Sequence, residues 1–284
     1  MVKTYIKYML IGYVIFLANA CSRQSSHHSQ GYIEGRYTYM ATPVSGNLKE
    51  LYVERGSKVQ AGQKIFVLEE QPESDALDAA IENLKQTINA RDVIAANLAY
   101  AKITYERYKI LVPKQAIQQS ELDSAKSTYD ATVAQLAQAN ANIASSTASL
   151  AQAKWTKEQK SVYAPVDAIV FDIYYRLGEY TIADQAVLSL LAPADIKAIF
   201  YISETDLGGI HLHDEISLHC DGCGKDYVGH VSFISPTAEY TPPVIFSTET
   251  NEKLVFRLEA EFAPQDAINL HPGQPVTVTY QTHD

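Results

Sequence analysis

The stretch from Glu73 to Gln159 constrains the fold more than any other part of the chain. Its apolar residues recur every three or four positions, which is typical of a coiled-coil seam that faces a partner helix. The first arm of this seam is predicted to consist of Leu77, Ile81, Leu84, Ile88, Ala95, Leu98 and Tyr105, interrupted by Arg91 and Lys102. The pattern breaks at Val112-Pro113, because proline cannot continue a helix and disfavours helix at the residue before it. We therefore predict that the first of two long helices ends there.

A second arm repeats the pattern after the break. Its predicted seam consists of Leu122, Tyr129, Val133, Leu136, Ile143 and Leu150, with Lys126, Asn140, Thr147 and Lys154 at the other seam positions. Small residues beside this stripe would let the helices approach closely, namely Ala125, Ala139 and Ala153. Ser120 is expected to cap the start of this arm, and an arm of roughly 38 residues would span on the order of 55–60 Å. A coiled coil that only dimerises is the simplest alternative, and the flanking segments argue against it.

Two short β-rich segments flank the helical stretch and resemble each other. The first begins Ala41-Thr-Pro-Val-Ser-Gly, the second begins Tyr163-Ala-Pro-Val-Asp-Ala, and each continues through a glycine turn into a strand. Two such copies form an internal repeat. Because neither copy is long enough to bury a core alone, we expect them to pair into one small sandwich, with the helical stretch inserted at its midpoint.

This arrangement resembles the split lipoyl or biotinyl domain of the HlyD-type periplasmic adaptor proteins, also called membrane fusion proteins. The adaptors' β-barrel domain is matched by Ser203-Glu-Thr-Asp-Leu, by the stretch from Val231 to Pro243, by Leu254-Val-Phe-Arg-Leu-Glu-Ala and by Pro272-Gly-Gln-Pro. The resemblance implies an elongated multidomain fold of mixed α and β class. It would consist of a long α-helical coiled-coil hairpin inserted in a split lipoyl-like β-sandwich, plus a β-barrel domain. Carrier chemistry is not expected, because the hairpin occupies the turn where a carrier domain holds its modified lysine.

Together with the composition of the N-terminal segment, the resemblance divides the 284 residues into six parts. These are a signal peptide ending in a lipobox-like cysteine (1–21), a polar tether (22–31), a strand joining the β domains (32–40), the split lipoyl/biotinyl-like domain (41–71 and 161–193), the α-helical hairpin (72–160) and the β-barrel domain (194–284). The tether contains His27 and His28, which we expect to be solvated rather than metal-bound.

The N-terminus has the pattern of an export signal. Lys3 and Lys7 precede an apolar run from Tyr8 to Ala20, and a run of roughly 13 residues is too short for a bilayer, which needs about 20. Ala20-Cys21 resembles the bacterial lipobox, in which the cysteine carries the lipid. A plain export signal or an uncleaved anchor is the alternative. We expect a periplasmic protein anchored to the inner membrane through Cys21 or the N-terminal segment, with sorting to the outer membrane as a second option.

The reversal between the two arms carries the sharpest functional signal. Adaptors that dock on outer-membrane exit ducts resemble one another there, with an arginine, three residues, a leucine, six residues and a serine. Arg107 and Leu111 keep this spacing, Gln118 stands at the serine position, and Ser120 follows two residues later. The resemblance implies that these four residues dock the outer-membrane partner. Arginine would bind carbonyl or carboxylate oxygens, leucine would fill a groove, and glutamine can still donate and accept hydrogen bonds.

Cys220-Asp-Gly-Cys223 lies at a predicted turn and has several histidines near it in sequence, His211, His213, His219 and His230. A Cys-x₂-Cys pair is half of a zinc site, but the chain has no second pair and the histidines lack the usual spacing. In an oxidising compartment the two cysteines could instead form a disulfide. We favour a disulfide or a pair of thiols, with a metal site and no special role as the alternatives. No metal site and no cofactor is predicted.

The sequence contains no Gly-x-Ser-x-Gly, phosphate loop or His-Glu-x-x-His motif, so we do not expect an enzyme. A net charge of −10 without a basic cluster argues against nucleic acid as a partner. The resemblance implies a periplasmic adaptor that links an inner-membrane transporter, expected to be of the ABC type, to an outer-membrane channel for efflux or secretion. It would act as a homo-oligomeric tube of hairpins, for which the family suggests a hexamer. The alternatives are a periplasmic metal-handling protein or heavy-metal efflux adaptor that uses the His/Cys cluster, and a structural spacer of the envelope.

Overall fold

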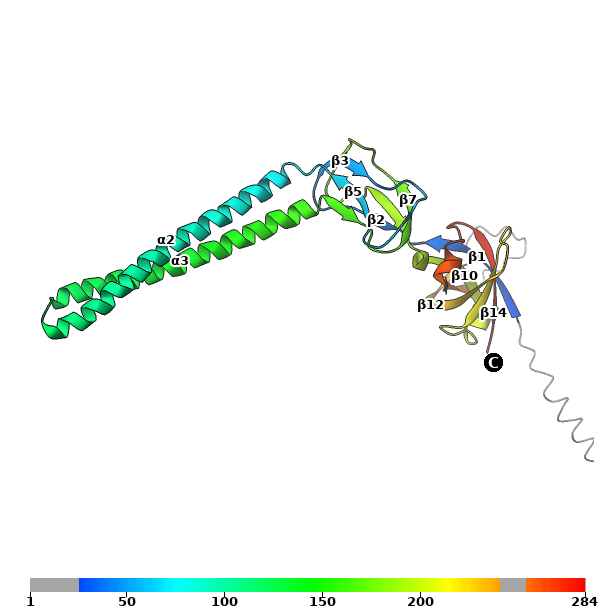
Figure 1. Cartoon of the computed structure of the whole chain (residues 1–284). Helices are drawn as coiled ribbons and strands as arrows, with labels where there is room; N and C mark the ends of the chain where they lie inside the picture. The colour runs from blue at the N-terminus through cyan, green and yellow to red at the C-terminus, as the bar shows by residue number, and fades with distance from the viewer. Residues whose placement is uncertain (1–25, 241–253, 284) are drawn as a thin grey trace, which may run out of the picture. The chain divides into compact units, whose positions relative to one another are not determined.

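The computed structural model describes residues 26–240 and 254–283 (Figure 1). The predicted signal segment with Cys21 lies outside these residues, and so does the end of the barrel stretch predicted from Val231 to Pro243. The chain forms two units. One contains residues 39–166 and 172–189, and the other contains the described residues up to Thr38 together with 167–171 and the chain from Leu190 onward.

The helical hairpin consists of α2 (Glu73–Leu111), a 3-10 turn (Val112–Lys114) and α3 (Gln119–Glu158), which lie antiparallel in Figure 1. Neither helix contains Gly or Pro, and acidic residues in the first turn of α2 complement the helix dipole. The predicted hairpin is confirmed, including its break at Val112-Pro113. The predicted cap is wrong, because Gln118 is the N-cap of α3 and Ser120 already lies inside the helix.

The β-sandwich consists of two four-stranded sheets, ordered β2-β9-β7-β4 and β6-β5-β3-β8. Its strands are β2 (Thr38–Met40), β3 (Gly46–Leu51), β4 (Lys58–Val59), β5 (Lys64–Leu68), β6 (Ser161–Tyr163), β7 (Ala168–Ile173), β8 (Tyr180–Thr181) and β9 (Leu188–Leu191). Both sheets contain strands from before and after the hairpin. Gly56 (φ 84°) and Gly178 (φ 85°) occupy equivalent turns of the two repeats, where a positive φ favours glycine. The two repeats therefore interleave into one sandwich, as predicted.

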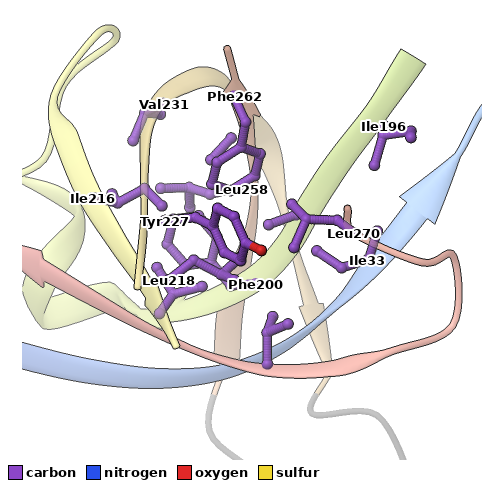
Figure 2. Close-up of a cluster of buried hydrophobic side chains, with 14 of the residues drawn as sticks. Ile33, Ile196, Phe200, Ile216, Leu218, Tyr227, Val231, Leu258, Phe262 and Leu270 are labelled. Carbon is purple, nitrogen blue, oxygen red and sulfur yellow. The ribbon is translucent and has the colours of Figure 1, made fainter. Parts of the chain in front are cut away.

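Six strands form a closed barrel in the order β1-β10-β13-β12-β11-β14. They are β1 (Ser26–Gly35), β10 (Ile196–Ser203), β11 (Glu215–His219), β12 (Tyr227–Tyr240), β13 (Leu254–Phe262) and β14 (Pro275–Gln281), joined by the short helices α4 (Glu204–Leu207) and α5 (Pro264–Ala267). Alternate residues of β10 are buried because side chains of a strand point to opposite faces. Figure 2 shows Phe200 and Leu258 in the apolar core. The predicted fold class is confirmed.

The predicted polar tether is partly wrong. Residues from Ser26 onward form strand β1 and pair with β14, from Ser26 opposite Gln281 to Tyr32 opposite Pro275. The polar composition of this segment suggested a tether. However, strand pairing uses backbone groups, so polar side chains on an exposed strand do not prevent it. His27, which we expected to be solvated, lies 3.4 Å from the Asp206 carboxylate.

Candidate functional site

The seam between α2 and α3 combines large and small residues, which alternate throughout α3 and in part of α2. On α2 the less exposed positions that recur at seam spacing are Leu77, Ala80, Leu84, Thr87, Arg91, Ile94, Leu98, Ala101, Tyr105 and Tyr108, and the predicted Ala95 is also partly buried. On α3 they are Leu122, Ala125, Tyr129, Thr132, Leu136, Ala139, Ile143, Ser146, Leu150 and Ala153. The rings of Tyr105 and Tyr129 stack across the seam with centroids 5.7 Å apart. The fully buried positions all carry small side chains: Ala101, Thr132, Ala139 and Ser146.

Eight of the nineteen predicted seam positions are therefore wrong. Ile81, Ile88 and Val133 are 44%, 36% and 42% exposed, and the polar residues predicted for the same rows also face solvent, namely Lys102, Lys126, Asn140, Thr147 and Lys154. In each case the preceding residue lies in the seam instead. Large apolar side chains suggested the register, whereas close approach of two helices requires small residues at alternate seam positions.

The tip of the hairpin reverses the chain with backbone hydrogen bonds. The Gln115 N–H donates to the Val112 carbonyl at 2.9 Å and the Ala116 N–H to the Leu111 carbonyl at 3.3 Å. Gln115 adopts a left-handed conformation with φ 57°. These bonds use local backbone groups, so the tip side chains remain available for contacts with a partner.

The structure places the four predicted docking residues at or next to this reversal. Gln118 and Ser120 are exposed and adjacent, with the Ser120 hydroxyl 3.4 Å from the Gln118 Oε1 that accepts its hydrogen bond. Leu111 is half-buried at the end of α2. Arg107 is exposed one turn earlier, on the side of α2 that faces away from α3. Gln118, Ser120 and Leu111 thus lie close to the reversal, and Arg107 extends the set along the helix.

The root of the hairpin contains a buried ion pair that the sequence did not reveal. Lys160 is 1% exposed. Its Nζ lies 2.9 Å from Glu73 Oε2 and donates to the Ser45 carbonyl at 2.8 Å. Removing one partner of such a pair would leave a buried charge, which is strongly unfavourable. The pair therefore fixes the start of α2 and the end of α3 to the first half of the sandwich. In the sequence, Lys160 follows a polar helix end and has no distinguishing signal.

Cys220 and Cys223 lie next to each other at the turn between β11 and β12, with Cα atoms 5.4 Å apart and their sulfurs at bonding distance. Cys220 is buried, and the Gln274 side-chain amide lies 3.6 Å from the Cys223 sulfur. His219 contacts Asp226 at 2.7 Å. In the part of the chain that the structure describes, no group of three or more His, Cys, Asp or Glu residues could hold a metal ion.

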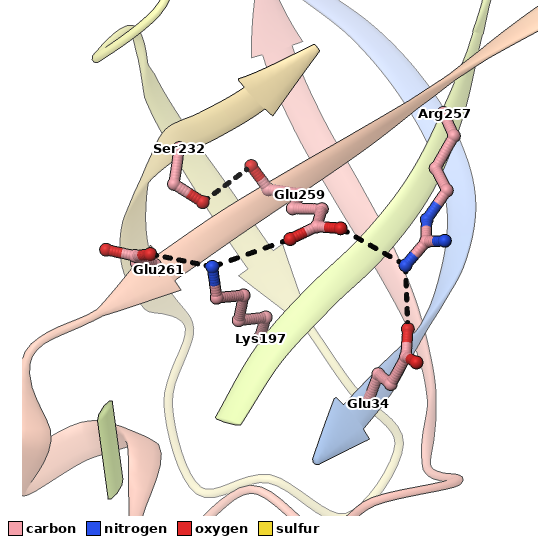
Figure 3. Close-up of polar contacts among 6 residues, drawn as sticks. All are labelled: Glu34, Lys197, Ser232, Arg257, Glu259 and Glu261. Atoms are coloured by element: carbon pink, nitrogen blue, oxygen red, sulfur yellow. Dashed lines mark hydrogen bonds and ion pairs between the residues drawn. The ribbon is translucent and has the colours of Figure 1, made fainter. Parts of the chain in front are cut away.

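One face of the barrel carries a ladder of alternating charges, drawn in Figure 3. Arg257 contacts Glu34 at 2.9 Å and Glu259 at 3.2 Å, and Lys197 contacts Glu259 at 3.4 Å and Glu261 at 2.8 Å. The Glu259 side chain is only 8% exposed and lies between the two cations. The ladder therefore connects β1, β10 and β13 through a buried carboxylate whose charge is compensated on both sides.

Burial and ion pairing shift the pKa values of several barrel residues. Desolvation opposes protonation of Lys197, but contacts with Glu261 and Glu259 outweigh it and raise the pKa of Lys197 above its usual value. The hydrogen bond from Lys197 lowers the pKa of Glu261 against the effect of burial. Burial, with Tyr32 and Glu239 nearby, raises the pKa of Tyr201 to about 12. These residues therefore keep their ordinary charge states at neutral pH.

Comparison with known proteins places the hairpin in a defined group. Residues 83–159 match the family described as RND MFP, alpha-helical hairpin domain. A UPF0194 membrane protein of Citrobacter koseri is 28% identical over 289 residues, covering 88% of this chain and 87% of the relative. A UPF0194 membrane protein of Acidithiobacillus ferridurans is 27% identical over 300 residues, covering 89% and 88%.

Solved structures show the same architecture. MacA from Actinobacillus actinomycetemcomitans superposes with a TM-score of 0.74 at 16% identity, covering 91% of this chain and 79% of that one. The membrane fusion protein Spr0693 from Streptococcus pneumoniae R6 gives a TM-score of 0.63 at 16% identity, covering 91% and 99%. A long helical hairpin inserted between the halves of a β-sandwich, in a chain that also carries a closed barrel, defines the fold of a membrane fusion protein. The predicted resemblance to this family of adaptors is confirmed, and no helix within the described residues is long and apolar enough to cross a bilayer.

Proposed function

We propose that this protein is the periplasmic adaptor subunit of an efflux or secretion assembly, connecting an inner-membrane transporter to an outer-membrane channel. The observation that carries this proposal is the hairpin itself. Helices of 39 and 40 residues span about 55–60 Å, and the hairpin combines an exposed tip with a root fixed by Lys160 and Glu73. A spacer built in this way can contact one partner at its tip while the β domains contact another.

We assign the transporter to the ABC type because of the barrel stretches that resemble adaptors of that kind, such as Ser203-Glu-Thr-Asp-Leu. The family that matches the hairpin has RND in its description. Identification of the inner-membrane transporter that is captured with this protein therefore tests the assignment to the ABC type. Anchoring is proposed through a lipid on Cys21 or through the N-terminal segment. The assembly is proposed to be a homo-oligomer, with six copies as the family suggests. We propose no metal-handling role, since no specific observation favours one.

We place the outer-membrane contact at Arg107, Leu111, Gln118 and Ser120. Their position at the reversal means that replacing an exposed member should change the free energy of unfolding by no more than about ±0.5 kcal/mol. A buried arginine or leucine anchor of an interface, in contrast, can contribute more than about 2 kcal/mol to binding. Folding and partner capture should therefore respond differently to the same substitution.

The experiment is chemical cross-linking in cells, followed by purification of the protein and identification of the captured partners. The double variant Arg107→Ala/Gln118→Ala, which changes two exposed members of the set, should melt at nearly the wild-type temperature, reach the membrane and lose the outer-membrane channel. The matched control Asn83→Ala/Gln86→Ala changes two exposed residues of α2 far from the tip and should capture as wild type. A tip variant that folds, reaches the membrane and still captures the channel would refute the docking site.

A further inference from the structure

The first residues of strand β1 pair with the barrel on one side only. Residues Ser26–Tyr32 pair with β14, whereas the pairing with β10 begins at Gly31. We call Ser26–Gln30 the polar segment of β1. Toward β10 its Ser29 hydroxyl donates a hydrogen bond to the Tyr201 carbonyl. A stretch that is held by one ladder of backbone hydrogen bonds, at the end of a strand, opens more easily than the paired interior of a sheet.

The polar segment contributes nothing to the apolar core of the barrel. Its sequence is Ser-His-His-Ser-Gln, and its side chains alternate between exposed and half-buried. Ile33, further along the same strand, is fully buried in the core. The core therefore fixes the second half of β1, while the attachment of the polar segment depends on its hydrogen bonds and polar side-chain contacts.

His27 makes the most extensive of these side-chain contacts. Its ring stacks on Tyr280 of β14 with the centroids 5.6 Å apart, and its Nε2 lies 3.5 Å from the Thr282 hydroxyl. Its Nδ1 lies 3.4 Å from Oδ2 of Asp206, a residue of α4 whose side chain is 18% exposed. The same carboxylate accepts a hydrogen bond from the Tyr280 hydroxyl at 2.8 Å. Asp206 thus connects the polar segment to α4 and β14.

The contact between His27 and Asp206 depends on the proton of the imidazole. Among the side-chain types that meet here, only imidazole ordinarily titrates between pH 5 and 8. Burial, followed by the hydrogen bond to Asp206, raises the pKa of Tyr280 above its ordinary value, so its hydroxyl continues to donate. Protonation of His27 therefore adds an ion pair to an otherwise unchanged set of contacts. The other carboxylate of α4, Glu204, is exposed and acts in the same direction.

The remaining histidines at this end of the barrel are arranged differently. His28, on the polar segment itself, contacts the neutral Thr279 hydroxyl at 2.9 Å. His283 and His211 lie 3.6 and 3.9 Å from the Asp214 carboxylate. They act on the residues that follow β14, and protonation strengthens their contacts as well. His27 is the histidine that connects the polar segment to a carboxylate.

We infer that the polar segment of β1 is a pH-sensitive attachment, which His27 and Asp206 hold on the barrel in acid and which opens as the pH rises. The sign follows from the proton, because the ion pair is present below the titration range of imidazole and is lost above it. Opening would add five residues, or about 17 Å, to the connection between the barrel and Cys21. This consequence rests on the proposed anchor, whereas the attachment itself does not.

Hydrogen exchange tests the attachment. The full-length protein in detergent micelles is compared at pH 5.5 and pH 8 by mass spectrometry, after correction for the intrinsic exchange rates. Protection of residues 26–30 should be roughly two- to fivefold greater at pH 5.5. His27→Gln and Asp206→Asn should each remove the difference. His28→Gln, an exposed change beside a neutral hydroxyl, is the matched control and should preserve it. Equal protection of the wild type at both pH values, or a difference that His27→Gln leaves intact, would overturn the inference.

A disulfide separates opening of the segment from other effects of pH. Ser26 and Gln281 are exposed partners in the register of β1 and β14, and cysteines at paired positions of antiparallel strands lie within bridging distance. Ser26→Cys/Gln281→Cys should lose the pH difference when oxidised and regain it when reduced. A difference that persists in the oxidised form would contradict opening. Neither experiment requires a transporter or channel, so failure of the attachment leaves the proposed function standing, and a failed partner capture leaves the attachment standing.

Discussion

The hairpin and the barrel bury their side chains in opposite ways. The barrel surrounds a cluster of large apolar residues, among them Phe200, Leu258 and Val278, which are fully buried. The hairpin fully buries only small residues along its seam, such as Ala101 and Ala139, and leaves Tyr100 and Ile110 largely exposed. The barrel thus has a core of its own, while the hairpin depends on helix propensity and a thin seam.

This difference indicates that the hairpin provides surfaces for contacts with other molecules, whereas the barrel forms a self-contained core. A helix pair with a thin seam keeps most of its surface free, so residues on several sides can contact other molecules. Within residues 26–240 and 254–283 the barrel closes on itself, so each of its six strands pairs with a neighbour on both sides. Substitutions should therefore separate into two groups, those that unfold the barrel and those that alter contacts of the hairpin.

The largest effect is expected in the barrel core. Phe200→Ala removes a fully buried ring from strand β10, and such truncations lower the free energy of unfolding by about 3–5 kcal/mol. Denaturant titration followed by tyrosine fluorescence should show this loss. Helicity measured by circular dichroism should persist beyond the barrel transition if the two units unfold separately. A single shared transition would show that the hairpin depends on the barrel after all.

A smaller effect is expected in the seam. Ala139→Leu places extra volume at a buried position of the seam and should lower stability by up to about 3 kcal/mol. Ala144→Leu, at an exposed position of the same helix, is the matched control. Ile88→Ala should stay within about ±0.5 kcal/mol, because Ile88 lies outside the seam. If Ile88→Ala instead lowered the free energy of unfolding by much more, the result would support the seam register predicted from the sequence.

The cysteine pair should contribute less. We propose that Cys220 and Cys223 are bonded in the exported protein, so alkylating reagents should label neither until a reductant is added. Cys223→Ser should cost no more than about 2 kcal/mol, because the closed loop is short. Reduced wild type should match the variant in thermal melting. Free thiols in the freshly exported protein would contradict the bond.

The smallest effect is expected at the charge ladder, and it should depend on pH. The pKa of Glu261 is lowered from its ordinary 4.5 by Lys197, so the ionised form stabilises the folded state above that pH and the gain disappears as pH falls through the lowered value. Glu261→Gln should therefore lower stability by less than about 1 kcal/mol at pH 7 and have almost no effect in acid. Glu215→Gln is the control. A loss that is the same at both pH values would indicate lost packing instead.

Much of the fold could be predicted from the sequence, because helix propensity, the proline break and the β repeat are local signals. The seam register could only be half predicted. Ile81 and Ile88 are larger than Ala80 and Thr87, and the choice between neighbouring rows depends on how closely two helices approach, which is a tertiary property. The strand beginning at Ser26 was missed for a similar reason, since its pairing with β14 uses backbone groups rather than apolar side chains.

The candidate site was less accessible to sequence reasoning than the fold. Arg107 and Leu111 were predicted from a resemblance to the adaptors' tip motif, and the structure places them in the last turns of α2, before the reversal. Lys160 could not be found, because its burial depends on Ser45 and Glu73, which are far from it in sequence. The exposure of Tyr100 and Ile103 became apparent only once the seam was known.

The hairpin is inserted between the two interleaved halves of the sandwich. The length of the hairpin can therefore change during evolution without altering the sandwich. The sandwich requires only that the two arms begin and end side by side at Glu73 and Lys160. Adding one heptad to each arm would preserve both seam rows and move the tip outward by about 10 Å. Relatives of this chain could therefore match envelopes of different depth by gaining or losing seven-residue blocks in pairs, with the sandwich and the barrel left unchanged.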